Sequence, residues 1–297
     1  MQTGTSAVPD HVSVEIDGRT LRLSSLDKVL YPETGTTKGE VLQYYAQVAP
    51  VLLEQLRDRA VTRIRWPSGT GGPSFFEKNV PRGTPAWIRT VTLPAPGSTR
   101  DRETITYPVI DSVAGLTWLG NLAALELHVH QWRVSPSGEA LHPDRLVVDL
   151  DPGPGAGLAE CSQVAMWARD ILCDMGLDDL WPVTSGSKGL QLYVELDGTH
   201  PVAVVREVAQ GLAVALEAAH PSLVVSSMAK VKRGGKVLVD WSQNTASKTT
   251  ICPWSLRGKF GRPTVAAPRE WSELEDAVAG RTPLDQLSLD EALARLP

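Results

Sequence analysis

Two aspartates at the end of a short apolar segment have the types and spacing that could support catalysis. Residues 146–150 are apolar apart from one aspartate, which predicts a buried strand. Because side chains alternate along a strand, Asp149 and Asp151 should share one face, about 7 Å apart along the chain. Pro152 and Gly153 then predict a loop, which leaves both carboxylates at an open strand end. The carboxylates repel each other, and bound Mg²⁺ or Mn²⁺, which also binds nucleotide phosphates, would relieve that repulsion. An acidic loop edge is the alternative, because an isolated Asp-x-Asp pair is common.

A third carboxylate follows another apolar strand. Residues 237–241 have the sequence Val-Leu-Val-Asp-Trp, so Asp240 should also lie at a strand end. Three such carboxylates can bridge two metals for phosphoryl or nucleotidyl transfer. Beyond this strand, Gln243, Lys248 and Arg257 offer amide and cationic groups suited to a sugar and a triphosphate.

A glycine-rich loop connects two further predicted strands, residues 181–184 and 190–196. The loop contains Ser185, Ser187 and Lys188 between glycines, a composition that predicts an anion cradle of backbone N–H groups plus one cation. It is not a Walker loop, because the spacing differs and no helix follows directly.

Two histidines alternate along the predicted strand of residues 126–132, which places His128 and His130 on one face. His-x-His can bind a metal, but no third ligand has suitable local spacing. We therefore expect a hydrogen-bonding histidine on a sheet that faces the substrate.

Two lysines flank the start of a predicted helix. Thr36 or Thr37 is the expected N-cap, and Glu40 lies in the first turn. Helix N-termini favour anions, so Lys28 and Lys38 could bind a phosphate. Two exposed lysines without a ligand are the alternative from spacing alone.

Phe75 and Phe76 are adjacent beside a flexible loop and several basic residues. Neighbouring strand residues face opposite ways, so one ring should be in the core and one exposed. An exposed ring can stack on a nucleobase for about 1–3 kcal/mol. The alternative is that both rings are buried.

The remaining pattern predicts an α/β fold with a mixed sheet flanked by helices. Residues 12–23 alternate around Asp17-Gly18 as a hairpin, and helices are expected at residues 112–125, 158–175 and 202–219. Gly176 is the expected helix C-cap. The sheet should bring the three aspartates together from distant positions.

The composition is that of a soluble globular protein of 297 residues, with no apolar run long enough for a membrane span. The three cysteines have no metal or disulfide spacing, which fits a reducing cytoplasm. Although the net charge is −5, residues 226–262 hold eight basic residues and only one acid, Asp240. Such a basic patch suits nucleic acid. A solvated surface without a ligand is the alternative.

These motifs together resemble the polymerase domain of bacterial ligase D, in the archaeo-eukaryotic primase superfamily. The resemblance spans about residues 20–270. It rests on eight segments in order: Asp-Lys-Val-Leu-Tyr-Pro (27–32), Gly-Thr-Thr-Lys (35–38), Arg-Trp-Pro (65–67), Phe-Phe-Glu-Lys (75–78), Asp-Leu-Asp-Pro-Gly (149–153), Thr-Ser-Gly-Ser-Lys-Gly-Leu (184–190), Val-Asp-Trp-Ser-Gln-Asn (239–244) and Ser-Leu-Arg-Gly (255–258).

The resemblance implies a primase-like catalytic core with an RRM-like half. It also implies a template-dependent nucleotidyltransferase that accepts ribonucleotides and uses Mn²⁺ or Mg²⁺. Asp149, Asp151 and Asp240 would hold two metals. The residues implied around the nucleotide are His128, Ser185, Ser187, Lys188, Gln191, Gln243, Lys248 and Arg257. Those implied for a DNA 5′-phosphate are Ser25, Lys28 and Lys38. Those implied for template or other DNA contacts are Arg65, Phe75, Phe76, Lys78, Lys232 and Arg233.

The sequence departs from the family pattern at two positions: Gln191 stands where the family usually has histidine, and Ile64 where it often has a basic residue. The sequence of residues 1–11 predicts disorder. The resemblance implies a single domain over residues 12–297. Within it, residues 12–130 would carry the 5′-phosphate and template elements, residues 131–270 the metals and nucleotide, and residues 271–297 an acidic helical tail.

The expected partners are gapped or broken DNA with a 5′-phosphate, NTP or dNTP, a DNA ligase in the same polypeptide or operon, and Ku as a further candidate. No membrane partner is expected. Three functions compete: a DNA-repair primase-polymerase, a gap- or end-binding module with weakened catalysis, and a metal-dependent nuclease. The cationic cluster of Lys188, Lys248 and Arg257 favours the polymerase, because a nuclease needs no triphosphate site.

Overall fold

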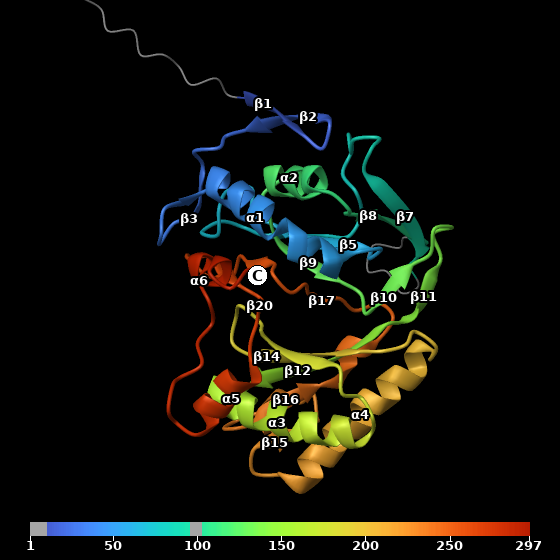
Figure 1. Cartoon of the computed structure of the whole chain (residues 1–297), viewed down its shortest axis with the longest axis vertical. Helices are drawn as coiled ribbons and strands as arrows, with labels where there is room; N and C mark the ends of the chain where they lie inside the picture. Colours follow the sequence, from blue (N-terminus) through green and yellow to red (C-terminus); the bar gives the residue numbers. More distant parts are fainter. Residues whose placement is uncertain (1–10, 96–102) are drawn as a thin grey trace, which may run out of the picture.

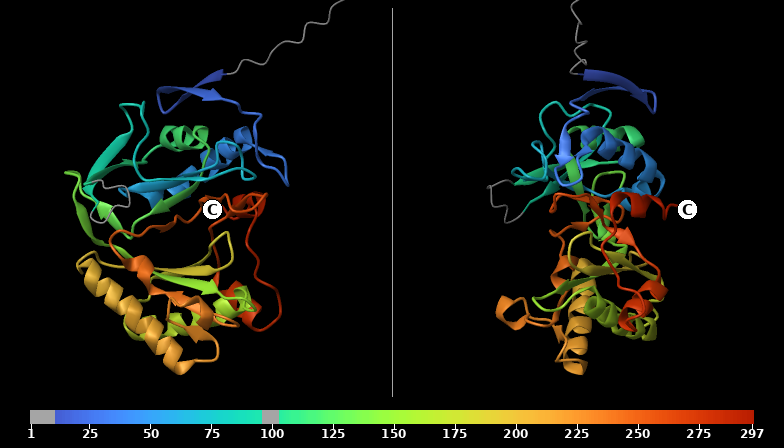
Figure 2. Two further views of the ribbon diagram at one scale, coloured as in Figure 1. Left: turned by 180° about the vertical axis from the view of Figure 1, so that it is seen from behind. Right: turned by 90° about the vertical axis from the view of Figure 1, so that its left-hand side faces the viewer.

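Two β-sheets stack with their inner faces toward each other, and helices cover their outer sides (Figure 1). The computed structural model describes residues 11–95 and 103–297. Turning the molecule shows the same division into two halves, with the C-terminus beside their junction (Figure 2). The predicted disorder concerns residues that lie outside the described ones, except for His11, which begins the first strand.

The six-stranded sheet forms one half of the molecule. Its strands, in spatial order, are β15 (Val224–Val225), β16 (Val237–Asp240), β12 (Arg145–Pro152), β14 (Leu190–Glu195), β13 (Leu180–Thr184) and β20 (Ala267–Pro268). β15 and β16 are parallel and the other pairs antiparallel, so the predicted mixed sheet is confirmed. Its outer face packs against helices α3 (Leu158–Asp174), α4 (Val202–Ala219) and α5 (Trp271–Val278) in one apolar cluster.

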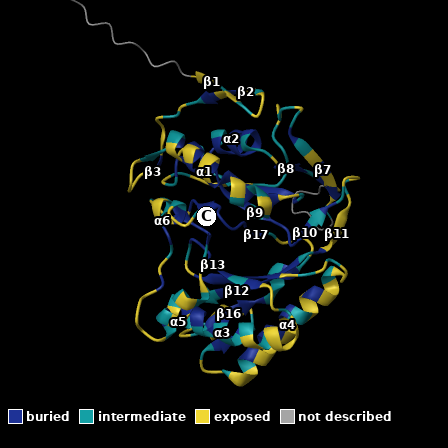
Figure 3. Ribbon diagram, viewed as in Figure 1, coloured by how far each residue is buried: buried dark blue, intermediate teal, exposed yellow. Residues whose placement is uncertain are grey.

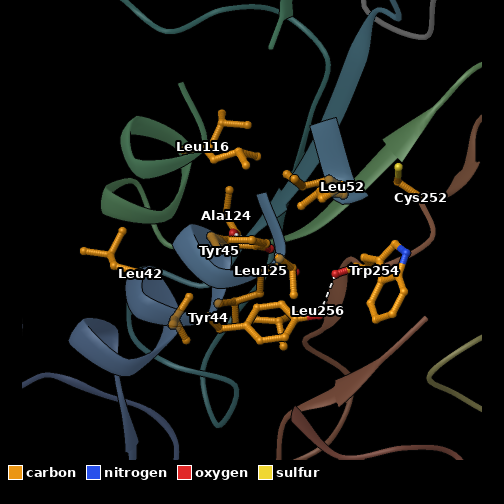
Figure 4. Packing of buried hydrophobic residues seen from close by; sticks show 14 of the residues in the cluster. Leu42, Tyr44, Tyr45, Leu52, Leu116, Ala124, Leu125, Cys252, Trp254 and Leu256 are labelled. Carbon is orange, nitrogen blue, oxygen red and sulfur yellow. Dashed lines mark hydrogen bonds between the residues drawn. The ribbon is translucent and has the colours of Figure 1, made fainter. Parts of the chain in front are cut away.

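A second sheet, which was not predicted as separate from the first, forms the other half. It is antiparallel and contains β17 (Thr250–Ile251), β9 (Ala124–Val129), β5 (Val61–Arg65) and β6 (Phe75–Glu77). Helices α1 (Lys38–Leu56) and α2 (Val113–Asn121) cover its outer face. Figure 4 shows this core, where the Tyr44 hydroxyl donates to the carbonyl of Trp254 at 2.7 Å.

Short paired strands and turns complete the fold. They are β1 (His11–Ile16) with β2 (Arg19–Ser24), β3 (Val29–Tyr31) with β4 (Thr36–Thr37), β7 (Arg89–Pro94) with β8 (Thr104–Val109), β10 (Trp132–Val134) with β11 (Ala140–Pro143), and β18 (Leu256–Arg257) with β19 (Thr264–Val265). The chain also has 3₁₀ turns η1 (Lys230–Lys232) and η2 (Trp241–Asn244), and a last helix, α6 (Leu289–Leu293).

Most predicted helix ends agree with the structure. Thr37 caps α1 in a capping box with Glu40, and Gly176 follows α3 with a φ of +79°. The helix expected at residues 112–125 ends earlier, at Asn121, because Ala123 adopts a φ of +57° and β9 begins directly after it. The acidic tail is helical only in α5 and α6.

Burial follows this arrangement of two stacked sheets covered by helices on their outer sides. The central strands are buried, whereas the outward surfaces of α1, α3 and α4 are exposed (Figure 3). Among the described residues, no helix is both long and apolar enough to cross a membrane.

Candidate active site

Strand alternation places the first two aspartates on the inner face of the six-stranded sheet. Leu146, Val148 and Leu150 point outward into the helix-covered core. The intervening residue Val147 packs between the two sheets, so Asp149 and Asp151 point the same way. This confirms that the two carboxylates share one face.

The third aspartate joins them through strand pairing. Asp149 is the direct partner of Asp240 in the antiparallel pair of β12 and β16. One oxygen from each of Asp149, Asp151 and Asp240 lies within 4.8 Å of the others. Carboxylate oxygens are the donors that Mg²⁺ and Mn²⁺ prefer, so these residues fit a divalent metal centre.

Burial and mutual repulsion hold protons on this cluster. Burial, followed by the charge of Asp151, raises the pKa of Asp149 to about 7, although a hydrogen bond from Gln191 opposes the shift. Burial and the charge of Asp240 also raise the pKa of Asp151. A bound cation would replace these protons and remove the repulsion.

Two sets of hydrogen bonds orient the carboxylates. The Gln191 amide donates to Oδ1 of Asp149 at 2.9 Å and accepts from the Tyr193 hydroxyl at 3.1 Å. Asp240 accepts from the backbone N–H and hydroxyl of Ser242, and Gln243 donates to its Oδ2 at 2.9 Å. Asp149 and Asp240 are therefore held in place by side chains and backbone of the protein itself.

A cavity of about 550 Å³ opens beside the carboxylates, between the two sheets. Nine of the predicted metal and nucleotide residues line it: His128, Asp149, Asp151, Ser185, Ser187, Lys188, Gln191, Gln243 and Arg257. Lys248 does not line the cavity but donates to Ser242, which in turn holds Asp240. The structure thus gathers side chains from both sheets around one space.

The glycine-rich loop packs tightly against its neighbours. A Cβ on Gly189 would lie 2.1 Å from the Leu150 carbonyl, and one on Gly186 would lie 2.5 Å from Arg257. The N–H groups of Ser187 and Gly189 donate to the Ser185 hydroxyl, and that of Gly186 donates to Gln286. These three N–H groups already have protein partners, so in this arrangement they are not available to the predicted anion cradle.

The prediction that the two histidines share one face of a strand is wrong for His130. β9 ends at Val129, and His130 is buried against Tyr107 and Trp132. Only His128 reaches the cavity.

Several residues of the site were not predicted from the sequence. The cavity is also lined by Thr249, Thr250, Ile251, Lys259 and Phe260. Behind its wall, Glu126 bonds both His128 and Arg257. Glu126 precedes His128 by two positions, and this strand spacing was a signal that could have identified it.

A second cationic group lies at the start of α1. The Lys38 side chain, only 5% exposed, donates to the Ser24 carbonyl at 2.7 Å, and Lys28 donates to the Pro67 carbonyl at 2.7 Å. Burial, then the charges of Lys28 and Arg65, lower the pKa of Lys38 to about 8. Ser25 lies in the same turn, where its carbonyl accepts from the Lys28 N–H at 3.1 Å.

The two adjacent phenylalanines on β6 are both exposed, at 49% for Phe75 and 55% for Phe76. The expectation that one ring would be in the core is therefore wrong, because β6 is the edge strand of its sheet. The ammonium group of Lys78 lies 6.0 Å from the Phe76 ring centroid. Arg65 instead pairs with Glu77 at 2.9 Å.

The basic loop of residues 230–236 approaches the chain directly after Asp151, one of the three clustered carboxylates. Gly153 packs so closely that a Cβ there would lie 1.8 Å from the Arg233 carbonyl. The Arg233 guanidinium donates to the Met228 carbonyl at 2.8 Å, which ties the two arms of the loop together, while Lys232 is exposed.

Residues 37–297 match the family model described as LigD, primase-polymerase domain. The chain belongs to this family. The LigD domain model covers both sheets and all three aspartates, and so accounts for the fold and the carboxylate cluster together.

Two curated relatives and one solved structure support this family assignment. The chain is 49% identical over 279 residues to the multifunctional non-homologous end joining DNA repair protein LigD of Mycobacterium tuberculosis (strain ATCC 25618 / H37Rv), covering 92% of the chain and 35% of that protein. It is 33% identical over 260 residues to the bifunctional LigD of Bacillus subtilis (strain 168), covering 87% and 40%. The polymerase domain from Mycobacterium tuberculosis ligase D in complex with DNA superposes with a TM-score of 0.85 at 49% identity, with 93% of each chain covered. The chain thus spans about a third of the length of the mycobacterial LigD proteins.

Proposed function

We propose that this chain is a template-dependent nucleotidyltransferase that adds nucleotides to a primer 3′-hydroxyl at short gaps or DNA ends. The observation that carries the proposal is the cluster of Asp149, Asp151 and Asp240 beside a cavity lined by Lys188 and Arg257. Membership of the LigD primase-polymerase family supports the same activity.

The three aspartates would hold two divalent ions, Mn²⁺ or Mg²⁺. When bound, such ions lower the pKa of a hydroxyl nucleophile and neutralise charge on a triphosphate. The protein's own contribution is to fix the carboxylates: Gln191 orients Asp149, whereas Ser242 and Gln243 orient Asp240. Fixed donors need little reorganisation when charge develops in the transition state.

The cavity suits a nucleoside triphosphate because it is cationic opposite the carboxylates. Lys188, Lys259 and Arg257 line it together with His128. We assign these side chains to the phosphates of the nucleotide. Ser185 and Ser187 would shape the loop that presents Lys188, and Gln243 would lie near the sugar. Lys248 would act through Ser242.

The other two basic regions suit DNA. We assign Ser25, Lys28 and Lys38 to a 5′-phosphate, and the exposed rings of Phe75 and Phe76, with Lys78 and Arg65, to the template. Lys232 and Arg233 would contact the DNA near the carboxylates. We also propose that residues 12–297 act as one domain, with 12–130 facing the DNA, 131–270 holding metals and nucleotide, and 271–297 closing the fold.

The relatives' names suggest a biological setting. Because the mycobacterial proteins are described as multifunctional in non-homologous end joining, we propose that this chain works with a ligase and with Ku at DNA breaks.

Primer extension on a gapped duplex with a 5′-phosphate tests the proposal. We expect templated addition of NTP or dNTP with Mn²⁺ by the wild type, and loss of addition in Asp149→Ala. Tight DNA binding without addition would leave a binding module, and release of nucleotides from the primer would indicate a nuclease. Either outcome overturns the polymerase assignment.

A further inference from the structure

Glu126 is a buried carboxylate behind the nucleotide-facing wall of the cavity. Its side chain is 1% exposed and does not line the cavity, whereas its two side-chain partners, His128 and Arg257, both do. These partners come from different parts of the chain, β9 and β18. A single carboxylate thus connects two groups that we assign to the triphosphate.

Both oxygens of Glu126 are used. Oε2 bonds Nε2 of His128 at 2.8 Å and accepts from the Arg257 guanidinium at 3.2 Å. Oε1 accepts from the N–H of Gly258 at 3.0 Å. A Cβ on Gly258 would lie 2.4 Å from the Trp66 ring, so this backbone segment has little freedom to move. The carboxylate and its partners are therefore fixed before any ligand binds.

The carboxylate is ionised and can only accept hydrogen bonds. Burial alone would raise the pKa of Glu126, but the hydrogen bond from His128 and the charge of Arg257 lower it overall. The proton between Glu126 and His128 must then reside on Nε2 of the histidine. In a neutral ring this leaves Nδ1 with a lone pair and no hydrogen to donate.

The position of the proton on His128 determines whether its ring can bind an anion. Among the described residues, Nδ1 of His128 has no hydrogen-bond partner, and the ring lines the cavity. A phosphate oxygen is an acceptor, so it can bond Nδ1 only when the ring carries a second proton. Glu126 would stabilise that imidazolium from behind.

We propose that Glu126 is a positioning residue that fixes Arg257 and couples triphosphate binding to protonation of His128. The inference rests on the proposed function, because it takes the cavity to bind a nucleoside triphosphate. In the free protein His128 is mainly neutral, because burial lowers its pKa. Arg257 and Lys259 lower it further and Glu126 raises it, while Lys188, Asp149 and Asp151 are the other charged groups around the cavity. A bound triphosphate would bring negative charge next to the His128 ring, which favours the protonated form.

Calorimetric titration of the full chain with a ribonucleoside triphosphate tests the coupling. Measurements at saturating Mn²⁺ in two buffers of different ionisation enthalpy give the number of protons taken up on binding. Saturating metal keeps the aspartate cluster in one state throughout. The variants are Glu126→Gln and His128→Asn. Glu273→Gln is the matched control, because Glu273 likewise bridges two basic side chains, Arg269 and Arg295, but lies on α5, away from the cavity.

At about pH 7.5, we expect the wild type and Glu273→Gln to take up close to one proton. Glu126→Gln should take up less and bind about tenfold or more weakly, since it loses bonds to charged groups. His128→Asn should also lack the uptake. Equal affinity and equal uptake in wild type and Glu126→Gln would overturn the inference. Wild-type protein that binds no triphosphate would overturn the proposed function as well.

Nitrogen NMR of His128 also tests whether the ring gains a proton when triphosphate binds. It uses the wild-type protein, so no variant has to fold correctly. We expect a proton on Nε2 alone in the free protein, and on both nitrogens when triphosphate is bound. A neutral ring in the complex, or a free ring protonated on Nδ1, would contradict the coupling.

Discussion

Asp149 and Asp240 lie directly opposite each other across the antiparallel pair of β12 and β16. Side chains of directly opposed residues share one face of the sheet, so this register sets two buried carboxylates beside each other. Asp151 adds a third from the same strand, with one oxygen of each within 4.8 Å. The backbone thus fixes an arrangement of like charges that only protons or cations can neutralise, and its energetics can be measured.

Binding of Mn²⁺ should depend on pH in a defined direction. The pKa of Asp149 is raised to about 7, first by burial and then by the charge of Asp151. Below this pH a proton must leave before the metal binds, so affinity should rise with pH up to about 7 and then level off. Electron paramagnetic resonance of free Mn²⁺ between about pH 5.5 and 8 would measure this. A flat profile over that range would contradict a protonated cluster.

Removing one of these charges should stabilise the metal-free protein. Because the pKa of Asp149 is raised on folding, the folded state binds this proton more tightly than the unfolded state. The ionised carboxylate is therefore destabilising above about pH 7, and the effect fades as the pH falls toward the ordinary value of 3.8. Asp149→Asn should raise the melting temperature at about pH 8 by about 1–2 °C for each kcal/mol recovered.

The same variant should lose the stabilisation that added Mn²⁺ gives the wild type. Asp170→Asn is a suitable control, because Asp170 is an exposed carboxylate on α3, outside the cluster. A lower melting temperature for Asp149→Asn without metal would show that hydrogen bonding outweighs the repulsion at this position.

Gln191 should support metal binding through its amide. It donates to Asp149 at 2.9 Å and is itself held by the Tyr193 hydroxyl. Gln191→Leu removes a bond to a charged group, which is worth about 1.5–3 kcal/mol, so Mn²⁺ affinity should fall about tenfold or more. Gln191→His retains a donor and should change affinity much less. Equal losses in both variants would show that side-chain shape, rather than the donated bond, matters here.

The local chemistry of the site was predictable because it depends on short-range patterns. The alternation of Leu146, Val148 and Leu150 with Asp149 and Asp151 determines which face the carboxylates occupy, and the structure confirms it. The capping box at Thr37 and the glycine after α3 are equally local.

What the sequence could not predict depends on long-range packing. The division into two sheets is set by strand pairing across the chain, as between β17 and β9. Glu126 acts through Arg257, which is far away in the sequence. The exposure of both Phe75 and Phe76 follows from an edge position that no local pattern reveals.

Recognition of a DNA 5′-phosphate should weaken in alkaline solution. Burial, then Lys28 and Arg65, lower the pKa of Lys38 to about 8, so its charge is lost as the pH rises through that value. The affinity ratio between gapped DNA with and without the 5′-phosphate should therefore fall between about pH 7 and 9. Fluorescence anisotropy with both duplexes measures the ratio. In Lys38→Gln the ratio should be small and independent of pH, and a wild-type ratio that stays constant would contradict the role of Lys38.

The exposed rings on β6 should contribute to DNA affinity without contributing to stability. Phe75 and Phe76 are each about half exposed, and their strand is the edge of its sheet, so truncation leaves no cavity in the core. A ring that stacks on a nucleobase contributes about 1–3 kcal/mol, which corresponds to a loss of roughly fivefold to more than a hundredfold in affinity. We expect Phe75→Ala and Phe76→Ala to weaken binding of a gapped duplex by such factors, with melting temperatures near that of the wild type.

A comparison of leucine and alanine at these positions separates stacking from simple apolar contact. Leucine retains apolar area but has no π-face, so Phe76→Leu should lose nearly as much affinity as Phe76→Ala if the ring stacks on a base. Val214→Ala is a control, because Val214 is an exposed apolar residue on α4, outside the basic regions assigned to DNA. If Phe76→Leu binds DNA as tightly as the wild type, apolar contact alone accounts for the contribution. If neither alanine variant loses affinity, the edge strand does not touch the template, and the assignment of β6 to the DNA-facing surface is wrong.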